Sequence, residues 1–212
     1  MPLRTSAATF PLVKAIAGIF HLPRNRQAKL NYMNAQRIPS IDPATATGSN
    51  KRFFDLLQST LGMIPNMTRS MAQSPAVLEG YISLSGALSK GSLSKRLGEE
   101  LALSVADANR CDYCASAHTA LGKLAGLSDT QIQAALHGSA QEAKDAAALK
   151  FAEVIVEKRG RISEDDFKAI IDAGFTPGEA GEIVAHVALN VFTNYFNNVA
   201  VTEIDFPRVT TA

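Results

Sequence analysis

Two cysteines and a histidine in the middle of the chain are the residues whose types and spacing best support chemistry. The stretch RCDYCASAHTALGKLAG holds Cys111, Cys114 and His118, and the chain has no other cysteine. If a helix begins near Cys111, spacings of three and four residues put all three side chains on one face. Cysteines one helical turn apart lie within the usual range for a disulfide, so this pair can cycle between dithiol and disulfide.

The start of a helix also favours the reactive form of a cysteine. A helix N-terminus stabilises thiolate over thiol, and an adjacent imidazolium acts in the same direction. A reactive, accessible thiol beside a second thiol is what peroxide reduction or thiol–disulfide exchange requires. From its position we expect Cys111, nearer the helix start, to feel the helix dipole most and to be the more exposed thiol.

The preceding segment, SKRLGEELALSVADANR, carries Glu99 and Glu100 near its start. If this segment is a helix packed beside the next one, a carboxylate there could orient or deprotonate His118 or a cysteine. Acidic residues in a first turn also compensate the helix dipole without any catalytic role. Spacing alone does not separate these two interpretations.

Two other interpretations of the cysteines stay open. The pair could pack as small hydrophobic residues, or it could bind zinc together with His118 and Glu99. Structural zinc sites usually take a second ligand pair from a separate loop, and the sequence offers none, so we predict no metal. A thioredoxin-like fold is not predicted either, because the βαβ context of that motif is absent.

The composition narrows the class of protein. The chain has 212 residues with 46% hydrophobic and 19% charged residues, which is typical of a soluble globular protein. Its 21 basic and 20 acidic residues give a net charge of +1, so we expect no nucleic-acid partner. No run approaches the ~20 apolar residues of a membrane span, so we expect no membrane partner. Two cysteines cannot form a secreted disulfide scaffold, which favours a cytoplasmic location.

The N-terminal segment, residues 1–37, differs from the rest. It is basic and free of acidic residues, the first of which is Asp42, and it contains the amphipathic run TFPLVKAIAGIF. Two interpretations stay open: a surface arm, or an organelle-targeting segment if the source is eukaryotic. The stretch Ile38–Ser49, with its prolines and glycine, is predicted to be an extended linker to the following domain.

From about residue 50 onward the pattern is helical almost throughout. Apolar residues recur every three or four positions in three segments that end near Leu61, Leu88 and Ala108. Ser128 with Gln131, and Thr176 with Glu179, are spaced as capping boxes. The similar segments AGLSDTQIQAAL and AGFTPGEAGEIV suggest helical hairpins, so we predict an all-α fold.

A polar stripe runs along the apolar C-terminal segment. It consists of His186, Asn190, Asn194 and then Asn197 or Asn198, at helical spacing. Buried polar groups need partners, so the stripe is either a hydrogen-bonded seam between helices or subunits, or one wall of a pocket. We favour the seam.

With these motifs in view, residues 38–207 resemble the alkylhydroperoxidase D-like, peroxidase-related branch of the carboxymuconolactone decarboxylase family. The resemblance includes RIPSIDPATATG, LGMIPNMTRSMAQSPAVLEGYISLSGAL and VAHVALNVFTNYFNNVAVTEIDFP, besides the central GEELALSVADANRCDYCASAHTALGKLAGLS. The family pattern has a glutamate, a CxxC pair twelve positions later and a histidine four residues beyond. Glu99, Cys111, Cys114 and His118 meet that pattern, and Glu100 does not.

The resemblance implies an AhpD-like helical domain over residues 38–212, assembled as a homo-oligomer, a trimer or hexamer. It also implies reduction of small hydroperoxides without a bound cofactor, with an external thiol or lipoyl-type protein as reductant. Peroxide attack would fall on Cys114 and Cys111 would resolve the product, while Glu99 and His118 relay the proton. A histidine that precedes the second cysteine in the alkylhydroperoxidase is replaced by Tyr113, which cannot act as a base at neutral pH.

The sequence therefore predicts a thiol-dependent hydroperoxide reductase. Three alternatives stay open: a general disulfide reductase, a redox-sensing oligomer and a lactone enzyme of the carboxymuconolactone decarboxylase type. The true decarboxylases of the family do not use a CxxC pair, which disfavours the last.

Overall fold

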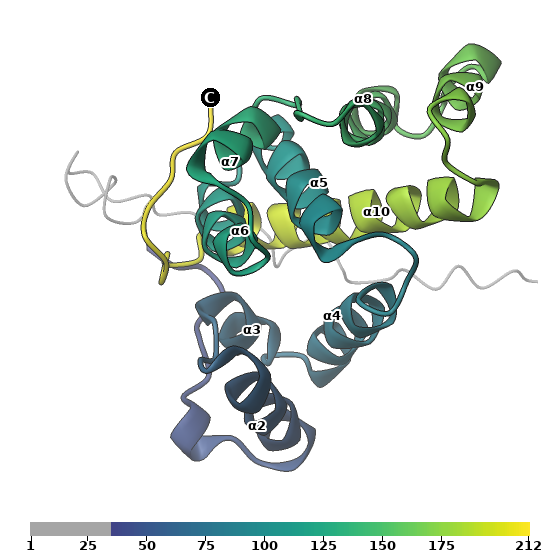
Figure 1. Cartoon of the computed structure of the whole chain (residues 1–212). Helices are drawn as coiled ribbons and strands as arrows, with labels where there is room; N and C mark the ends of the chain where they lie inside the picture. Colours follow the sequence, from purple (N-terminus) through teal and green to yellow (C-terminus); the bar gives the residue numbers. More distant parts are fainter. Residues whose placement is uncertain (1–34) are drawn as a thin grey trace, which may run out of the picture. The chain divides into compact units, whose positions relative to one another are not determined.

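The computed structural model describes residues 35–212, and Gln36–Ala212 form one compact unit. No strand occurs in this part of the chain, and the predicted all-α fold is confirmed. Its helices, shown in Figure 1, are η1 (Pro43–Thr45), α2 (Gly48–Leu61), α3 (Asn66–Met71), α4 (Pro75–Leu88), α5 (Lys95–Ala108), α6 (Asp112–Leu124), α7 (Asp129–Leu136), α8 (Ala143–Lys158), α9 (Glu164–Asp172) and α10 (Pro177–Ala200).

Hydroxyl side chains fix where several of these helices begin. The predicted capping boxes at Ser128 and Thr176 are both present, at the starts of α7 and α10. A third box pairs Ser163 with Asp166 at the start of α9. In each box a side-chain oxygen accepts a backbone N–H that the first turn leaves without a partner, which sets the helix start.

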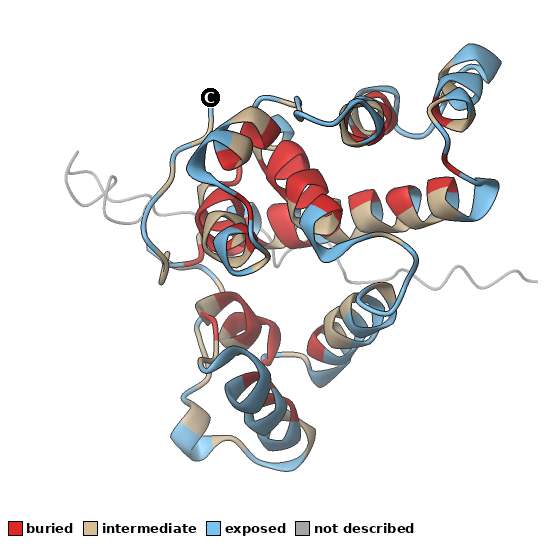
Figure 2. Ribbon diagram, viewed as in Figure 1, coloured by how far each residue is buried: buried red, intermediate tan, exposed pale blue. Residues whose placement is uncertain are grey.

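Helix α5 lies at the centre of the fold and separates two hydrophobic clusters. It packs against α6, α7, α8 and α10, and Figure 2 shows it buried along most of its length. Leu103 belongs to the cluster formed with α2, α3, α4, α6 and α7. Leu101 belongs to the second cluster, formed with α8, α9 and α10. We call these the first and second clusters; the cysteine pair lies in the first.

The stretch predicted as an extended linker is instead packed against α3. The N–H of Ile41 donates to the carbonyl of Arg69 at 3.0 Å, and the Arg69 guanidinium donates back to the Ile41 carbonyl at 3.1 Å. The Gln36 side chain donates to Ser70 at 2.7 Å. The linker prediction is therefore wrong, because reciprocal hydrogen bonds and the side chain of Ile41 tie this stretch to the first cluster. The predictions for residues 1–34 lie outside the described residues.

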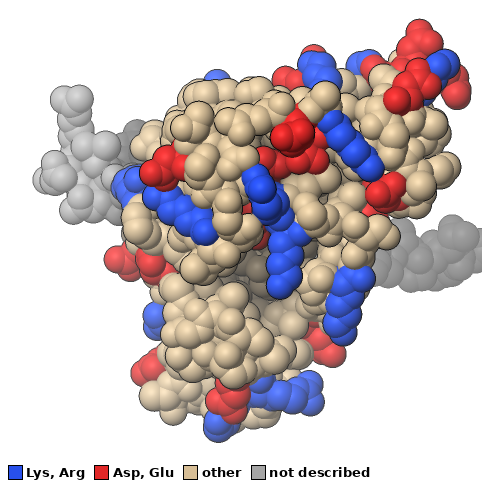
Figure 3. Space-filling model, viewed as in Figure 1, with Lys and Arg blue, Asp and Glu red and all other residues tan. Residues whose placement is uncertain are grey.

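The described surface carries mixed charge. On the face in Figure 3, basic and acidic side chains are interspersed. Within residues 35–212, no helix combines the length and apolarity that a bilayer span requires.

Candidate redox site

A tight turn between α5 and α6 presents the two cysteines. Arg110 takes a left-handed conformation, with φ 51°, and the next N–H, that of Cys111, donates to the carbonyl of Ala106. Cys111 is then the N-cap of α6, and its Sγ accepts from the N–H of Cys114 at 3.2 Å. The Cys111 sulfur therefore caps the start of α6 in the same way that a hydroxyl oxygen caps α7, α9 and α10.

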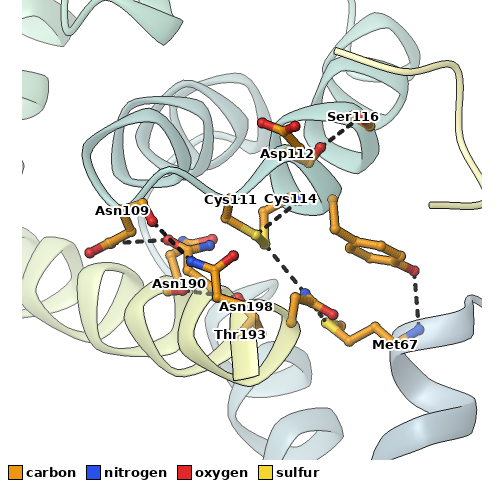
Figure 4. Close-up of a disulfide and its surroundings, with 12 residues drawn as sticks. Met67, Asn109, Cys111, Asp112, Cys114, Ser116, Asn190, Thr193 and Asn198 are labelled. Atoms are coloured by element: carbon orange, nitrogen blue, oxygen red, sulfur yellow. Dashed lines mark hydrogen bonds between the residues drawn. A yellow bond between two sulfur atoms is a disulfide. The ribbon is translucent and has the colours of Figure 1, made fainter. Parts of the chain in front are cut away.

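Cys111 and Cys114 form a disulfide, with their Cα atoms 5.3 Å apart (Figure 4). Cys111 is 0% exposed and Cys114 is 3% exposed. The expectation that Cys111 is the more exposed cysteine is wrong, because its side chain folds inward over the first turn of α6 and packs in the first cluster. Both sulfurs are therefore shielded from bulk solvent in this oxidised state.

A side chain from α10 reaches the sulfur pair. The amide nitrogen of Asn197 lies 3.3 Å from Cys114 Sγ and 3.1 Å from the thioether sulfur of Met67. Asn197 is itself buried. The contacts of Asn197 therefore bring together α3, α6 and α10, three helices that are far apart in the sequence.

Tyr113 points away from the sulfurs, toward α3 and the C-terminal segment. Its hydroxyl accepts from the N–H of Met67 at 3.1 Å and donates to the carboxylate of Asp205 at 2.9 Å. Burial is the main cause that raises the pKa of Tyr113 above its usual value, and Asp205 acts in the same direction against the opposing N–H of Met67. Tyr113 therefore stays neutral and serves as a structural hydrogen-bonding group.

The C-terminal segment, residues 201–212, lies along α6 beyond Tyr113. The ring of Phe206 packs edge-on against the Tyr113 ring, with centroids 5.8 Å apart. The N–H of Val209 donates to Ser116 at 2.9 Å, and the N–H of Thr211 donates to Asp112 at 3.0 Å. This segment therefore covers the first turns of α6, next to the disulfide.

Glu99 and His118 are brought together as the sequence predicted. Nδ1 of His118 lies 2.8 Å from a carboxylate oxygen of Glu99, across the contact between α5 and α6. Their side chains are 24% and 22% exposed. Within residues 35–212, neither side chain hydrogen bonds to a cysteine sulfur. The same range contains no group of three or more His, Cys, Asp or Glu side chains arranged to hold a metal ion.

Comparison with known proteins shows which family this part of the chain is similar to. Residues 75–157 match the carboxymuconolactone decarboxylase family. The matched segment includes Glu99, Cys111, Cys114 and His118. The resemblance inferred from the sequence is confirmed.

Solved structures extend the family's fold over most of the chain. The alkylhydroperoxidase AhpD core, an uncharacterized peroxidase-related protein from Ralstonia eutropha JMP134, is 24% identical with a TM-score of 0.74, and the alignment covers 80% of this chain and 92% of that one. A peroxidase-related protein from Silicibacter sp. TM1040 is 21% identical with a TM-score of 0.69, covering 78% and 91%. The debrominase Bmp8, in complex with 2,3,4-tribromopyrrole, is 18% identical with a TM-score of 0.68, covering 79% and 91%. No curated protein matches the chain.

Of the two neighbouring glutamates, Glu99 matches the family pattern and Glu100 does not. In the structure their side chains have different surroundings. Glu100 is 3% exposed, and its Oε2 has no hydrogen-bond partner within the described residues. Burial, followed by the charge of Asp145, raises the pKa of Glu100, while Arg96 opposes the shift. Successive helical residues face different neighbours, so Glu99 meets α6 while Glu100 lies within reach of charges near the start of α8.

Two further titratable side chains, His186 and Tyr81, lie close enough to Glu99 for its charge to affect their pKa. The ring of His186 packs over Gly98, where a Cβ would come within 3.4 Å of the imidazole. Burial lowers the pKa of His186, and His118 adds to this, while Glu182 and Glu99 oppose it. Burial and Glu99 raise the pKa of Tyr81 to about 12. Nothing in the helical pattern of the sequence distinguishes the Tyr81 hydroxyl from its neighbours.

The polar stripe on α10 divides into separate roles. Asn190 donates to the carbonyl of His186 in its own helix at 2.9 Å. Asn194 accepts from the Asn109 side chain at 3.0 Å, which forms the predicted seam between helices. Asn198 donates to the Asn109 backbone carbonyl at 3.0 Å. Only Asn197 among the stripe asparagines reaches a sulfur, and the sequence had placed it in the stripe without that role.

Proposed function

We propose that the protein is a thiol-dependent hydroperoxide reductase in which Cys111 and Cys114 alternate between dithiol and disulfide. One observation carries the proposal: the Cys111–Cys114 disulfide lies at the start of α6, and His118, one turn further along the same helix, is hydrogen-bonded to Glu99 of α5. A redox-active sulfur pair and an acid–base pair are the two components that peroxide reduction requires.

The proposed reaction has two steps. The Cys114 thiolate attacks the terminal oxygen of the hydroperoxide, so a sulfur–oxygen bond forms, the oxygen–oxygen bond breaks, and the alkoxide leaves and takes a proton through the Glu99–His118 pair. The Cys111 thiolate then attacks the sulfur of the Cys114 sulfenic acid. A disulfide forms and the hydroxide leaves as water after protonation. Sulfur loses two electrons in total, and the peroxide gains them.

The disulfide must then be reduced from outside the chain. We propose an external dithiol, from a thiol or lipoyl-type protein, as the electron donor; two thiols are oxidised for each disulfide that is reduced. No bound cofactor takes part in this scheme. Its substrate is a small hydroperoxide, since the sulfurs lie in a packed cluster.

We also propose that the chain forms a homo-oligomer, a trimer or hexamer, as the resemblance implies. Apolar side chains on α10 stay exposed at helical spacing: Val184, Phe192, Tyr195 and Val199. A contiguous apolar stripe on a surface helix supports contact with a second copy of the chain. Sedimentation velocity of Phe192→Asp against wild type tests this, and an unchanged oligomer of wild type and variant would reject this stripe as the interface.

Single-turnover oxidation tests the function. Reduced protein is mixed with hydrogen peroxide, an alkyl hydroperoxide and a bulky aryl hydroperoxide, and free thiols are counted with time. We expect two thiols lost per chain and one alcohol formed per two thiols. Cys114→Ser should lose no thiol to peroxide beyond the rate of a free cysteine in solution. Failure of all hydroperoxides to oxidise the wild type would reject the proposal.

A redox-sensing role is the second candidate, and one observation favours it. Both sulfurs are almost completely buried, which slows exchange with external thiols. A sensor would oxidise once and stay oxidised, whereas an enzyme is recycled. The family is named for a lactone decarboxylase. If this chain had that activity, the activity would persist after replacement of both cysteines.

A further inference from the structure

Asn197 is the side chain that contacts the sulfur assigned to peroxide attack. Its amide nitrogen lies 3.3 Å from Cys114 Sγ and 3.1 Å from Met67 Sδ, and the residue is 3% exposed. Figure 4 labels Cys114 and Met67 and marks the hydrogen bonds between the residues drawn with dashed lines. Cys111 Sγ, in contrast, accepts from the N–H of Cys114 at the helix start. The two sulfurs therefore have different hydrogen-bond donors.

Donor and acceptor chemistry fixes the orientation of the Asn197 amide. A disulfide sulfur and a thioether sulfur can only accept, so the NH₂ group must face both of them. The carbonyl oxygen Oδ1, at the other end of the amide, is buried and has no partner within the described residues. An unpaired buried carbonyl is costly to keep, and such groups often mark a position where a ligand completes the hydrogen bonding.

We propose that Asn197 is a catalytic residue that uses both ends of its amide. This inference rests on the proposed peroxidase function. In the reduced protein the NH₂ group donates to the Cys114 thiolate, and Oδ1 accepts the O–H of the incoming hydroperoxide. The oxygen held by Oδ1 is the terminal one that bonds to sulfur, so a single side chain brings the two reacting atoms together.

The proposed role of Asn197 also gives the two cysteines different roles in the reaction. After the sulfur–oxygen bond forms and the oxygen–oxygen bond breaks, the hydroxyl of the Cys114 sulfenic acid stays in reach of the same amide. Cys111, held at the helix N-terminus, then displaces that hydroxyl. The amide therefore favours Cys114 as the attacked sulfur, although Cys111 lies nearer the positive end of the helix dipole.

Two variants of Asn197 test the proposal in a Cys111→Ser background, where serine keeps the N-cap and Cys114 is the sole thiol. Asn197→Asp keeps the shape and Oδ1 but replaces the donor by an anionic oxygen. Asn197→Leu removes donor and acceptor at similar size. The matched control is Asn198→Asp and Asn198→Leu, because Asn198 is adjacent, exposed and bonded to the Asn109 carbonyl instead.

Two readouts are measured: the pH dependence of thiolate absorbance for Cys114, and the second-order rate of Cys114 oxidation by an alkyl hydroperoxide. We expect both Asn197 variants to raise the pKa of the Cys114 thiol. We expect the rate to fall about 10- to 100-fold, the effect of losing one hydrogen bond to an anion. The Asn198 variants should match their parent in both readouts.

The two readouts keep this inference separate from the proposed function. If the parent protein reacts with no hydroperoxide, the proposed function fails, and with it the role of Oδ1. If the parent reacts but the Asn197 variants match the Asn198 controls in thiol pKa and in rate, the role of Asn197 is overturned. Folding of each variant is checked by circular dichroism, and Asn197→Asp is the more conservative of the two.

Discussion

The sulfur pair at the start of α6 and the Glu99–His118 pair, which joins α5 to α6, have different environments. Cys111 and Cys114 are almost completely buried in the first cluster, whereas the side chains of Glu99 and His118 are partly exposed. The sulfurs lie in the first cluster, against which the C-terminal segment also packs, and the Glu99–His118 pair lies at the contact of α5 and α6. The comparison teaches that position along a helix does not set exposure, because Cys114 and His118 are one turn apart on α6 yet differ in burial.

The largest effect is expected at the buried pair. Cys111→Ser keeps the N-cap of α6, since a serine hydroxyl also accepts a backbone N–H. The variant should consume one equivalent of hydroperoxide, accumulate a sulfenic acid at Cys114 and show no turnover. Mass spectrometry after trapping with a sulfenic-acid reagent locates the adduct. An adduct at Cys111 in the reciprocal Cys114→Ser variant, formed at the wild-type rate, would reverse the assignment.

Substitutions in the partly exposed Glu99–His118 pair should have the next largest effect on the rate of hydroperoxide reduction. Glu99→Gln and His118→Asn remove one partner each from the 2.8 Å contact. We expect the rate of hydroperoxide reduction to fall about 10²- to 10⁴-fold in either variant, the usual contribution of a general acid–base group. Oxidation and re-reduction of the disulfide by excess reagents should still be complete.

Glu100→Gln is the matched control for that experiment, because Glu100 is adjacent in sequence but buried near α8. Its rate of hydroperoxide reduction should equal that of the wild type. Equal losses in Glu99→Gln and Glu100→Gln would show that the rate responds to helix charge and not to the Glu99–His118 contact.

A smaller effect is expected where the C-terminal segment meets Tyr113. Tyr113→Phe removes the hydroxyl between the N–H of Met67 and the carboxylate of Asp205. Leaving the buried N–H of Met67 and the half-buried carboxylate of Asp205 without that partner should lower the free energy of unfolding by about 1–3 kcal/mol, measured by urea denaturation. The rate of hydroperoxide reduction should change little, because Tyr113 is neutral and bonds to no sulfur. A rate loss as large as that of His118→Asn would instead make Tyr113 part of the proton relay.

The smallest effect is a pH dependence of stability at Glu100. Its pKa is raised in the folded state above the ordinary value of 4.5, so the folded protein favours the protonated carboxyl. Stability is then lost as the pH rises above about 4.5 through the folded-state pKa. Glu100→Gln lacks this loss and should be more stable than the wild type at neutral pH, with the difference vanishing below pH 4.5. Denaturation curves at several pH values measure it.

Much of the fold could be predicted because it depends on local sequence. The helices that end at Leu61, Leu88 and Ala108 follow from apolar periodicity, and the boxes at Ser128 and Thr176 follow from cap chemistry. These features involve residues three or four apart, where steric and hydrogen-bonding preferences are set by the chain itself.

The remaining features depend on contacts between distant segments. Asn197 and Cys114 are 83 residues apart, and Tyr113 and Asp205 are 92 apart. No periodicity or spacing predicts which side chain of a polar stripe meets a sulfur, or that a C-terminal segment lies along α6. The burial of Cys111 was mispredicted for the same reason, since helix position sets the dipole but tertiary packing sets exposure.

Multiple turnover tests the central claim, that this sulfur pair is catalytic, most directly. Protein is incubated with excess dihydrolipoamide and an alkyl hydroperoxide, and the alcohol formed per chain is measured. We predict many equivalents of alcohol per chain for the wild type and, for Cys114→Ser, which lacks the attacked sulfur, no more than the protein-free background. Formation of one equivalent by the wild type, followed by a stable disulfide that excess dithiol does not reduce, would contradict the account.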